Sequence, residues 1–126
     1  MKRTYKITKL KTSAIRISML SVLLILTGCT PHPGAGIWIS PTDNDAHISK
    51  VSVFFEPTVK IFTSTSEQAI MQCGWWALDK KNIEMECVHL PETGVSEIYQ
   101  LNVIEQDKAE LVGQGKLIAA LIRKKE

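Results

Sequence analysis

The sequence predicts an all-β protein, a small antiparallel up-and-down barrel or sandwich, preceded by a cleavable amino-terminal segment. Two observations predict this class. From residue 37 onward, short stretches rich in β-branched and aromatic residues are separated by turn residues about every ten positions, as in β-sandwiches and barrels. Before that residue, a basic start is followed by an apolar stretch, so the amino-terminal part is of a different kind.

The amino-terminal segment has the flanks and the length of a secretory signal peptide. Residues 1–16 carry six positive charges and no acid, and residues 17–27 are mostly apolar. A membrane-spanning helix needs roughly twenty apolar residues, so this stretch is too short to be an ordinary transmembrane helix. A buried core helix and an uncleaved anchor are the alternatives.

The residues that end the apolar stretch, Leu26-Thr27-Gly28-Cys29, resemble the lipobox of bacterial lipoproteins. The resemblance implies that the chain is cleaved before Cys29, that this cysteine is the lipidation site, and that a lipid there anchors the protein to a membrane. Thr30 follows in place of an aspartate, which in this family implies the outer membrane, with the domain on its periplasmic face. Several acyl chains on one residue anchor stably, because each buried methylene contributes about 0.8 kcal/mol.

The predicted organisation is a signal peptide over residues 1–28, a lipidated tether over 29–36 and a β domain over 37–126. The tether contains two prolines and two glycines, which suit neither a helix nor a strand interior, so we expect it to contribute nothing to the core. Six of the 15 basic residues and none of the 13 acidic residues lie in the signal peptide. The remaining chain therefore carries a net charge of −4, which removes the compositional support for nucleic-acid binding.

The predicted strands are rich in Val, Ile, Phe, Trp and Thr, and each ends near a turn residue such as Pro57 or Gly94. In chain order the first six are residues 37–39, 50–56, 59–65, 70–78, 83–89 and 97–105.

Two interpretations of residues 107–124 compete. Asp107–Glu110 has the pattern of a helix capping box, and the apolar residues after it fall near helical spacing. Gly113 and Gly115 would lie inside that helix, where each costs about 1 kcal/mol. We therefore favour two strands, residues 110–112 and 116–123, with a turn between them.

Cys73 and Cys87 remain once Cys29 is assigned to lipid. An even pair of cysteines in an exported chain of this size predicts a disulfide in an oxidising compartment. Their Cα atoms should then lie roughly 4.4–6.8 Å apart. There are two alternatives. The cysteines could be the two thiolate ligands of a metal site, or they could be two inert buried thiols.

A disulfide between directly opposed cysteines also predicts the register of the hairpin. Trp75 then faces Met85, and Ala77 faces Ile83, across a three-residue loop. This alternation places the cysteines and the apolar residues on one face and the glutamates on the other, whereas a slip of one residue would turn the apolar residues outward. Loops of this length usually need a residue with positive φ, and Asn82 is the expected one.

Gly36-Ile37-Trp38 in the first predicted strand, the meander of strands after it, and Arg123 at the end of the last strand resemble the lipocalin-type up-and-down barrel. In that family a first-strand tryptophan packs against a late-strand arginine or lysine, which implies that Trp38 and Arg123 meet where the barrel closes. This chain is much shorter than a typical lipocalin. A barrel of this size is expected to be filled by its own side chains.

No catalytic constellation stands out, and the sequence predicts neither an enzyme nor a cofactor nor a metal site. His32, His47 and His89 are scattered and match no metal-binding spacing, so we interpret them as solvated or packed. Glu84 and Glu86 lie two apart on one face of a predicted strand, which is typical of a solvated surface rather than an acid–base pair.

Adjacent tryptophans supply the only binding candidate. Trp75 and Trp76 must point to opposite faces of one strand, and exposed tryptophan is enriched at binding hot spots, so Trp76 is the candidate anchor. The favoured hypothesis is a non-catalytic lipoprotein that binds a protein of the periplasm or outer membrane. The alternatives are an inhibitor, immunity or exclusion lipoprotein, and a carrier of a small apolar ligand, which would need an internal cavity of several hundred Å³.

Overall fold

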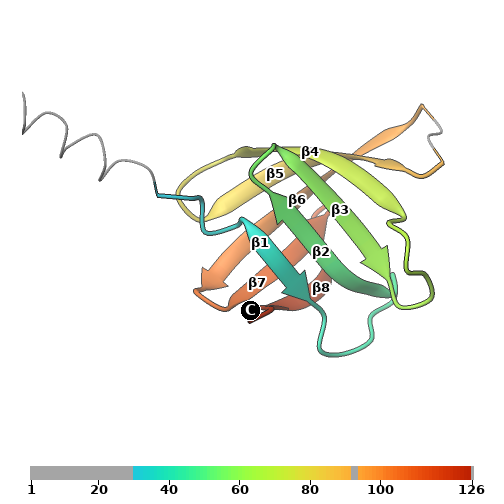
Figure 1. Cartoon of the computed structure of the whole chain (residues 1–126), viewed down its shortest axis with the longest axis horizontal. Helices are drawn as coiled ribbons and strands as arrows, with labels where there is room; N and C mark the ends of the chain where they lie inside the picture. Colours follow the sequence, from blue (N-terminus) through green and yellow to red (C-terminus); the bar gives the residue numbers. More distant parts are fainter. Residues whose placement is uncertain (1–29, 92–93, 126) are drawn as a thin grey trace, which may run out of the picture. The chain divides into compact units, whose positions relative to one another are not determined.

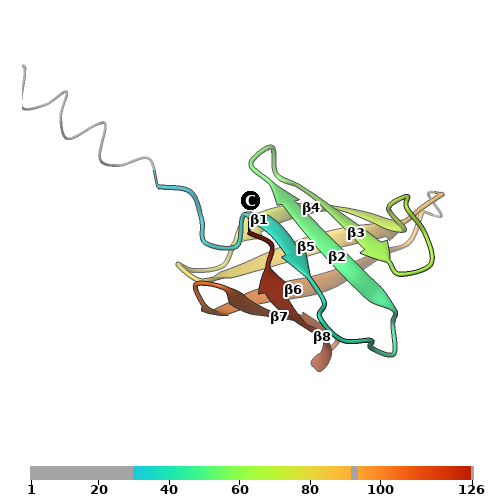
Figure 2. The same ribbon diagram turned by 60° about the horizontal axis from the view of Figure 1, so that its bottom comes forward.

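The computed structural model describes residues 30–91 and 94–125, which contain a closed eight-stranded antiparallel barrel (Figure 1). Each strand pairs with the next one in the chain, and β1 pairs with β8 to close the barrel (Figure 2). The strands are β1 (Gly36–Ile39), β2 (Ile48–Phe54), β3 (Thr58–Thr63), β4 (Met71–Ala77), β5 (Asn82–His89), β6 (Ser96–Glu105), β7 (Lys108–Gly113) and β8 (Lys116–Arg123).

The predicted all-β up-and-down barrel is confirmed, and residues 107–124 form strands rather than a helix. Strand ends differ from the prediction by a few residues. The clearest difference is at β2, which ends at Phe54, so that Phe55 and Glu56 lie in a turn instead of a strand. In the described part of the chain, no helix is long and apolar enough to cross a membrane. The predicted signal peptide and Cys29 lie outside the described residues.

Side chains from all eight strands fill the interior of the barrel. Alternation sends every second residue inward over most of the barrel, as in β3, where Val59 and Ile61 are buried and Lys60 is exposed. A bulge in β2 between Ile48 and Lys50 shifts this alternation, so that Ile48, Val51 and Val53 are its buried apolar residues. The inward residues form one hydrophobic cluster, consisting of Trp38, Ile48, Val51, Val53, Val59, Ile61, Met71, Cys73, Ile83, Met85, Cys87, Leu101, Val103, Ala109, Leu111, Ala119 and Leu121.

The hairpin of β4 and β5 has the predicted register. Cys73 pairs with Cys87, Trp75 with Met85 and Ala77 with Ile83, and the two cysteines form a disulfide. Their Cα atoms are 4.0 Å apart, which is less than the predicted 4.4–6.8 Å. The cysteines are directly opposed on adjacent antiparallel strands, where pairs that share no backbone hydrogen bond approach to about 4.5 Å.

The turn between β4 and β5 does not use the predicted positive φ at Asn82, since that residue keeps an ordinary negative φ. Instead, the Asp79 carboxylate organises the turn. Its Oδ1 accepts the N–H groups of Lys81 and Asn82, each at 2.8 Å, and its Oδ2 accepts the Asn82 side-chain amide at 2.9 Å. These hydrogen bonds hold the pKa of Asp79 below its usual value, with the Lys81 N–H as the largest cause.

Residues Pro31–Ala35, predicted to be a tether without a role in the core, belong to the folded domain. Gly34 is buried, and Ala35 packs against the core cluster. The Ala35 N–H donates to the His32 carbonyl at 3.0 Å, which closes a turn immediately before β1. The expectation was wrong because proline and glycine exclude a regular helix or strand but not a fixed turn.

Candidate functional site

Trp38 and Arg123 close the barrel between β1 and β8. They are register partners, Trp38 is fully buried, and the Arg123 Cζ lies 4.2 Å from the centre of a Trp38 ring, so the contact expected from the sequence is present. Arg123 also donates to the carbonyls of Pro33 at 2.6 Å, Ala35 at 2.8 Å and Gln106 at 2.9 Å. One guanidinium therefore joins the turn before β1 to the β6–β7 turn.

The turn before β1 contacts the side chains of both Trp38 and Arg123. The Trp38 indole N–H donates to the Gly34 carbonyl at 3.0 Å, so this buried donor is paired. Gly36 has a φ of +123°, and a Cβ there would lie 2.9 Å from the Arg123 Nη1. Glycine is needed at this position because both the backbone conformation and the guanidinium exclude a side chain.

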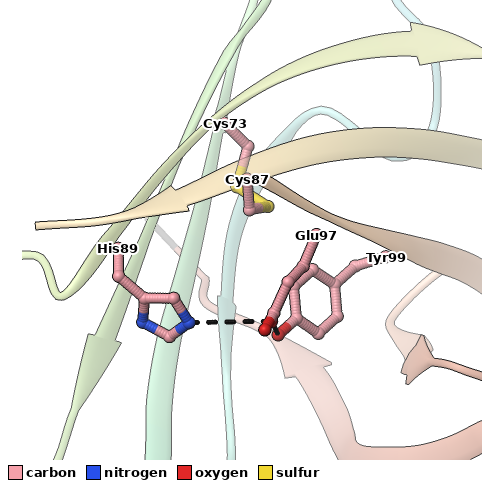
Figure 3. The surroundings of a disulfide bond; sticks show 5 residues. All are labelled: Cys73, Cys87, His89, Glu97 and Tyr99. Carbon is pink, nitrogen blue, oxygen red and sulfur yellow. Dashed lines mark hydrogen bonds and ion pairs between the residues drawn. A yellow bond between two sulfur atoms is a disulfide. The ribbon is translucent and has the colours of Figure 1, made fainter. Parts of the chain in front are cut away.

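We call the end where β1 begins and β8 ends the closed end, and the other end the distal end. Near the distal end, His89, Glu97 and Tyr99 form a polar cluster beside the Cys73–Cys87 disulfide (Figure 3). The Tyr99 hydroxyl donates to Glu97 Oε2, and His89 Nε2 lies 3.6 Å from the same oxygen. All three lie on the inward side of their strands.

Burial and the Glu97 carboxylate together raise the pKa of Tyr99 to about 12, burial being the larger cause. The Tyr99 hydroxyl in turn lowers the pKa of Glu97, and His89 contributes in the same direction. Tyr99 therefore stays protonated as a hydrogen-bond donor, and its high pKa makes it a poor nucleophile at neutral pH.

This cluster was not predicted from the sequence, although a signal for it exists. Cys87 pairs with Glu97, and Met85 pairs with Tyr99, so the register that joins β5 to β6 places Glu97 and Tyr99 on the cysteine face. The same alternation along β5 places His89 there. The β4–β5 register was predicted from the cysteines, but no comparable covalent link indicated the β5–β6 register.

The two adjacent tryptophans do point to opposite faces of β4. Trp75 packs against the core, and its indole N–H donates to the Phe54 carbonyl at 2.7 Å. Trp76 lies on the outer wall and is 42% exposed. Two residues earlier, Gly74 has no side chain, and a groove of about 620 Å³ runs over it, lined by Thr58, Gln72, Gly74, Trp76, Glu86 and Val88 among others.

The outer wall of β4 and β5 is acidic around Trp76. Glu84 is the register partner of Trp76, and Glu86 is the partner of Gly74. The outward positions of these two strands, Gln72, Gly74, Trp76, Asn82, Glu84, Glu86 and Val88, include no lysine or arginine. The outer wall of β2 and β3 has the opposite charge, because its outward positions, Lys50, Ser52, Phe54, Thr58, Lys60 and Phe62, include two lysines and no acid.

The three histidines do not come together. His32 Nε2 lies 2.7 Å from the Asp79 carbonyl at the closed end, and its Nδ1 accepts the Gly34 N–H at 3.0 Å. His47 Nδ1 lies 3.3 Å from an Asp43 carboxylate oxygen in the β1–β2 loop. Across residues 30–91 and 94–125, no three His, Cys, Asp or Glu side chains are placed to hold a metal ion.

The fold and the site define a small closed β-barrel with a filled interior and a groove on its outer wall. No protein-family model, curated protein or solved structure matches the chain.

Proposed function

We propose that this chain is a non-catalytic, lipid-anchored binding protein of the bacterial envelope, whose outer wall around Trp76 engages a protein of the periplasm or outer membrane. The observation that carries the binding part is the exposure of Trp76 beside the groove over Gly74. The lipobox-like Leu26-Thr27-Gly28-Cys29 supports the anchoring part.

The surface around Trp76 is preorganised for binding. Trp76 lies three residues after Cys73, and the disulfide and the strand pairing hold its backbone in one register. A side chain on such a support loses little conformational freedom when it binds, so more of the contact energy appears as affinity. An exposed tryptophan that fills a partner's pocket typically contributes 2 kcal/mol or more at a hot spot.

The charge of this wall indicates the chemistry of the partner. Glu84 and Glu86 flank Trp76 and Gly74, and Ile98 is the register partner of Glu86. We expect a partner surface with an apolar pocket for the indole and lysine or arginine side chains around it. Complementary charges of this kind mainly accelerate association and exclude wrong partners.

The buried cluster inside the barrel favours protein binding over a small-ligand carrier. A carrier needs an internal cavity, whereas this interior holds packed side chains, and the groove over Gly74 lies on the outer wall. An inhibitor, immunity or exclusion lipoprotein would use the same rigid wall, and the identity of the partner would distinguish that role.

Photo-crosslinking in the producing bacterium tests the binding part. A photoreactive residue at Gln72, in the groove, should give one discrete protein adduct, and Trp76→Ala should abolish it. The same residue at Ala120, exposed on β8, is the control and should give no such adduct. An adduct at Gln72 that survives Trp76→Ala, or equal adducts at both positions, would contradict the proposal.

Metabolic labelling with an alkyne fatty acid tests the anchoring part. The wild-type protein should incorporate the label, and Cys29→Ala should not. The double variant Cys73→Ala/Cys87→Ala is the matched control, because it removes cysteines and keeps the proposed lipidation site. Labelling that persists in Cys29→Ala would defeat the lipoprotein assignment.

A further inference from the structure

Three turns meet at the closed end of the barrel, together with the segment before β1 and the segment after β8. In an up-and-down barrel every second hairpin turn lies at the same end, and hydrogen bonds join these segments here. His32 Nε2 contacts the Asp79 carbonyl of the β4–β5 turn, and Arg123 donates to the Gln106 carbonyl of the β6–β7 turn. The closed end comprises residues 31–35, 55–57, 78–81, 106–107 and 124–125 (Figures 1 and 2).

A large apolar side chain is exposed at or beside each of the three turns. Phe55 lies in the β2–β3 turn and is 72% exposed, although turn positions usually carry Gly, Asn, Asp or Ser. Leu78 in the β4–β5 turn is 47% exposed, and Ile104 near the end of β6 is 51% exposed. Exposed apolar groups are a feature of surfaces that contact a partner or a membrane where they form one patch. The distal end also exposes Leu90, Val95 and Leu117, so the charge of the two ends is what distinguishes them.

The closed end is also the basic end of the barrel. Its connecting segments carry four lysines, Lys80, Lys81, Lys124 and Lys125, against three acids, and one of these acids, Asp79, is hydrogen-bonded within its own turn. The described loops of the distal end carry three acids and no lysine or arginine; the acids are Asp43, Asp45 and Glu67. This difference in charge between the two ends favours contact of the closed end with an anionic surface.

The sequence places the lipidation site close to this end. Only Thr30 separates Cys29 from Pro31, the first residue of the folded domain. Two extended residues span about 7 Å, which is far less than an extended tether of eight residues, the length expected from the sequence, would span. An acyl chain on Cys29 would therefore hold the closed end at the membrane surface.

We infer that the closed end is a membrane-docking surface that contacts a phospholipid bilayer with anionic headgroups. Phe55, Leu78 and Ile104 enter the interfacial region, and the lysines of the closed end meet the phosphates. The acidic distal end points into the aqueous compartment. This inference rests on the anchoring part of the proposed function, because the acyl chain on Cys29 supplies the attachment.

Spin labels on the acylated full protein test this orientation. The protein is added to preformed vesicles of phosphatidylethanolamine and phosphatidylglycerol, with the label at Phe55→Cys or at Val95→Cys. Val95 is the matched control, since it is apolar, 64% exposed and in the β5–β6 loop at the distal end. We expect a water-soluble nickel reagent to reach the Phe55 label several-fold less than the Val95 label. Equal access at both positions on vesicle-bound protein would overturn the inference.

A longer tether distinguishes lipid binding by the closed end from closeness to the bilayer that the short tether alone imposes. A flexible Gly–Ser segment inserted after Thr30 leaves the anchor in place but frees the barrel to move away from the bilayer. Protection of the Phe55 label should persist if the closed end has its own affinity for lipid, and its loss would overturn the inference. Protein that fails to float with the vesicles in the first place would instead contradict the anchoring part of the proposed function.

A measurement on the unsubstituted protein removes any dependence on the labels. A water-soluble amine-reactive reagent should modify Lys80 and Lys124 less on vesicles than in detergent. Lys116, at the start of β8 at the distal end, should react equally in both. Unchanged reactivity of the closed-end lysines would also overturn the inference.

Discussion

At the closed end of the barrel one arginine joins two segments of backbone, whereas near the distal end the side chains of His89 and Tyr99 meet at the Glu97 carboxylate. Arg123 covers the buried Trp38 and donates to carbonyls on both sides of the closure. The His89–Glu97–Tyr99 cluster is partly exposed, and it lies beside the only covalent cross-link among the described residues. The closed end is therefore held by the hydrogen bonds and the cation–π contact of one arginine, and the distal end by a disulfide and a polar cluster around one carboxylate.

This difference predicts how much a substitution at each end lowers the stability of the barrel. Arg123 alone makes three of the side-chain hydrogen bonds at the closed end, so this end is sensitive to the loss of one residue. The distal end divides its stability between a disulfide, a tyrosine–glutamate hydrogen bond and the close packing of Tyr99 on Gly113. Substitutions at the two ends should therefore differ in size and in their dependence on pH and reductant.

Arg123→Ala should cause the largest loss, lowering the free energy of unfolding by about 3 kcal/mol. The change removes the cation–π contact and the donors to three carbonyls, one of them part-buried. Trp38 fluorescence should shift to longer wavelength, because the indole loses its cover. Urea unfolding followed by fluorescence measures both effects.

Lys124→Ala is the control for Arg123→Ala. Lys124 is exposed and shares the closed end, but its contact there is made by its backbone N–H, which donates to the Ile37 carbonyl at 2.8 Å. The substitution keeps that bond and should change stability by less than about 0.5 kcal/mol. Equal losses in the two variants would mean that Arg123 is not the residue that closes the barrel.

Removing the disulfide should be the next largest effect, and it should be confined to the distal half. Cys73→Ala/Cys87→Ala should lower the free energy of unfolding by about 3 kcal/mol or slightly less, because the bond restricts a short loop of the unfolded chain. Hydrogen exchange should accelerate in the distal halves of β4 and β5, while Trp38 fluorescence stays unchanged. Two thiols that react freely in the native wild-type protein would refute the cross-link.

Sequence patterns predicted what depends on alternation and on covalent chemistry. Cys73 and Cys87 indicated one register, and that register placed Met85 inside and Glu84 outside, as observed. Residues 116–123 were predicted as a strand because Gly113 and Gly115 disfavoured a helix, and β8 confirms it. Each of these inferences used a rule that applies within a few residues of the chain.

Contacts that depend on backbone carbonyls could not be predicted in this way. Every residue has a carbonyl, so nothing in the sequence indicated that Arg123 would select those of Pro33 and Ala35. The same applies to the His89–Glu97–Tyr99 cluster, which requires the pairing of β5 with β6 to be known first. Composition correctly excluded regular structure in the turn before β1 but carried no information about its packing.

Gly113→Ala should destabilise the distal end by about 1–3 kcal/mol through overpacking. A Cβ at residue 113 would lie 2.6 Å from Tyr99 Cδ1 and 2.7 Å from Ile118 Cδ1. Displacement of the Tyr99 ring should break its hydrogen bond to Glu97, so the pKa of Tyr99 should fall from about 12 toward its ordinary value. Gly74→Ala is the matched control, because its Cβ would meet only the Pro57 carbonyl at 3.7 Å.

The smallest expected effect is a loss of stability at high pH that depends on Tyr99. Its pKa is about 12 in the folded protein against an ordinary 10.0, so the folded state binds this proton more tightly than the unfolded state. The contribution is complete below pH 10 and decreases as the pH rises from 10 through 12. Because Tyr99 is partly exposed, solvent screening limits it to about 1 kcal/mol.

Tyr99→Phe distinguishes the titration of Tyr99 from that of other groups in the barrel. The variant should be slightly less stable than wild type at neutral pH, and the difference should shrink between pH 10 and 12 because the wild type alone loses the Tyr99 contribution. Glu97→Gln should give an intermediate profile, since burial, the larger cause of the raised pKa, remains when the carboxylate charge is removed. Urea midpoints measured across this range give the comparison. A wild-type decline that Tyr99→Phe reproduces in full would show that the alkaline sensitivity does not come from Tyr99.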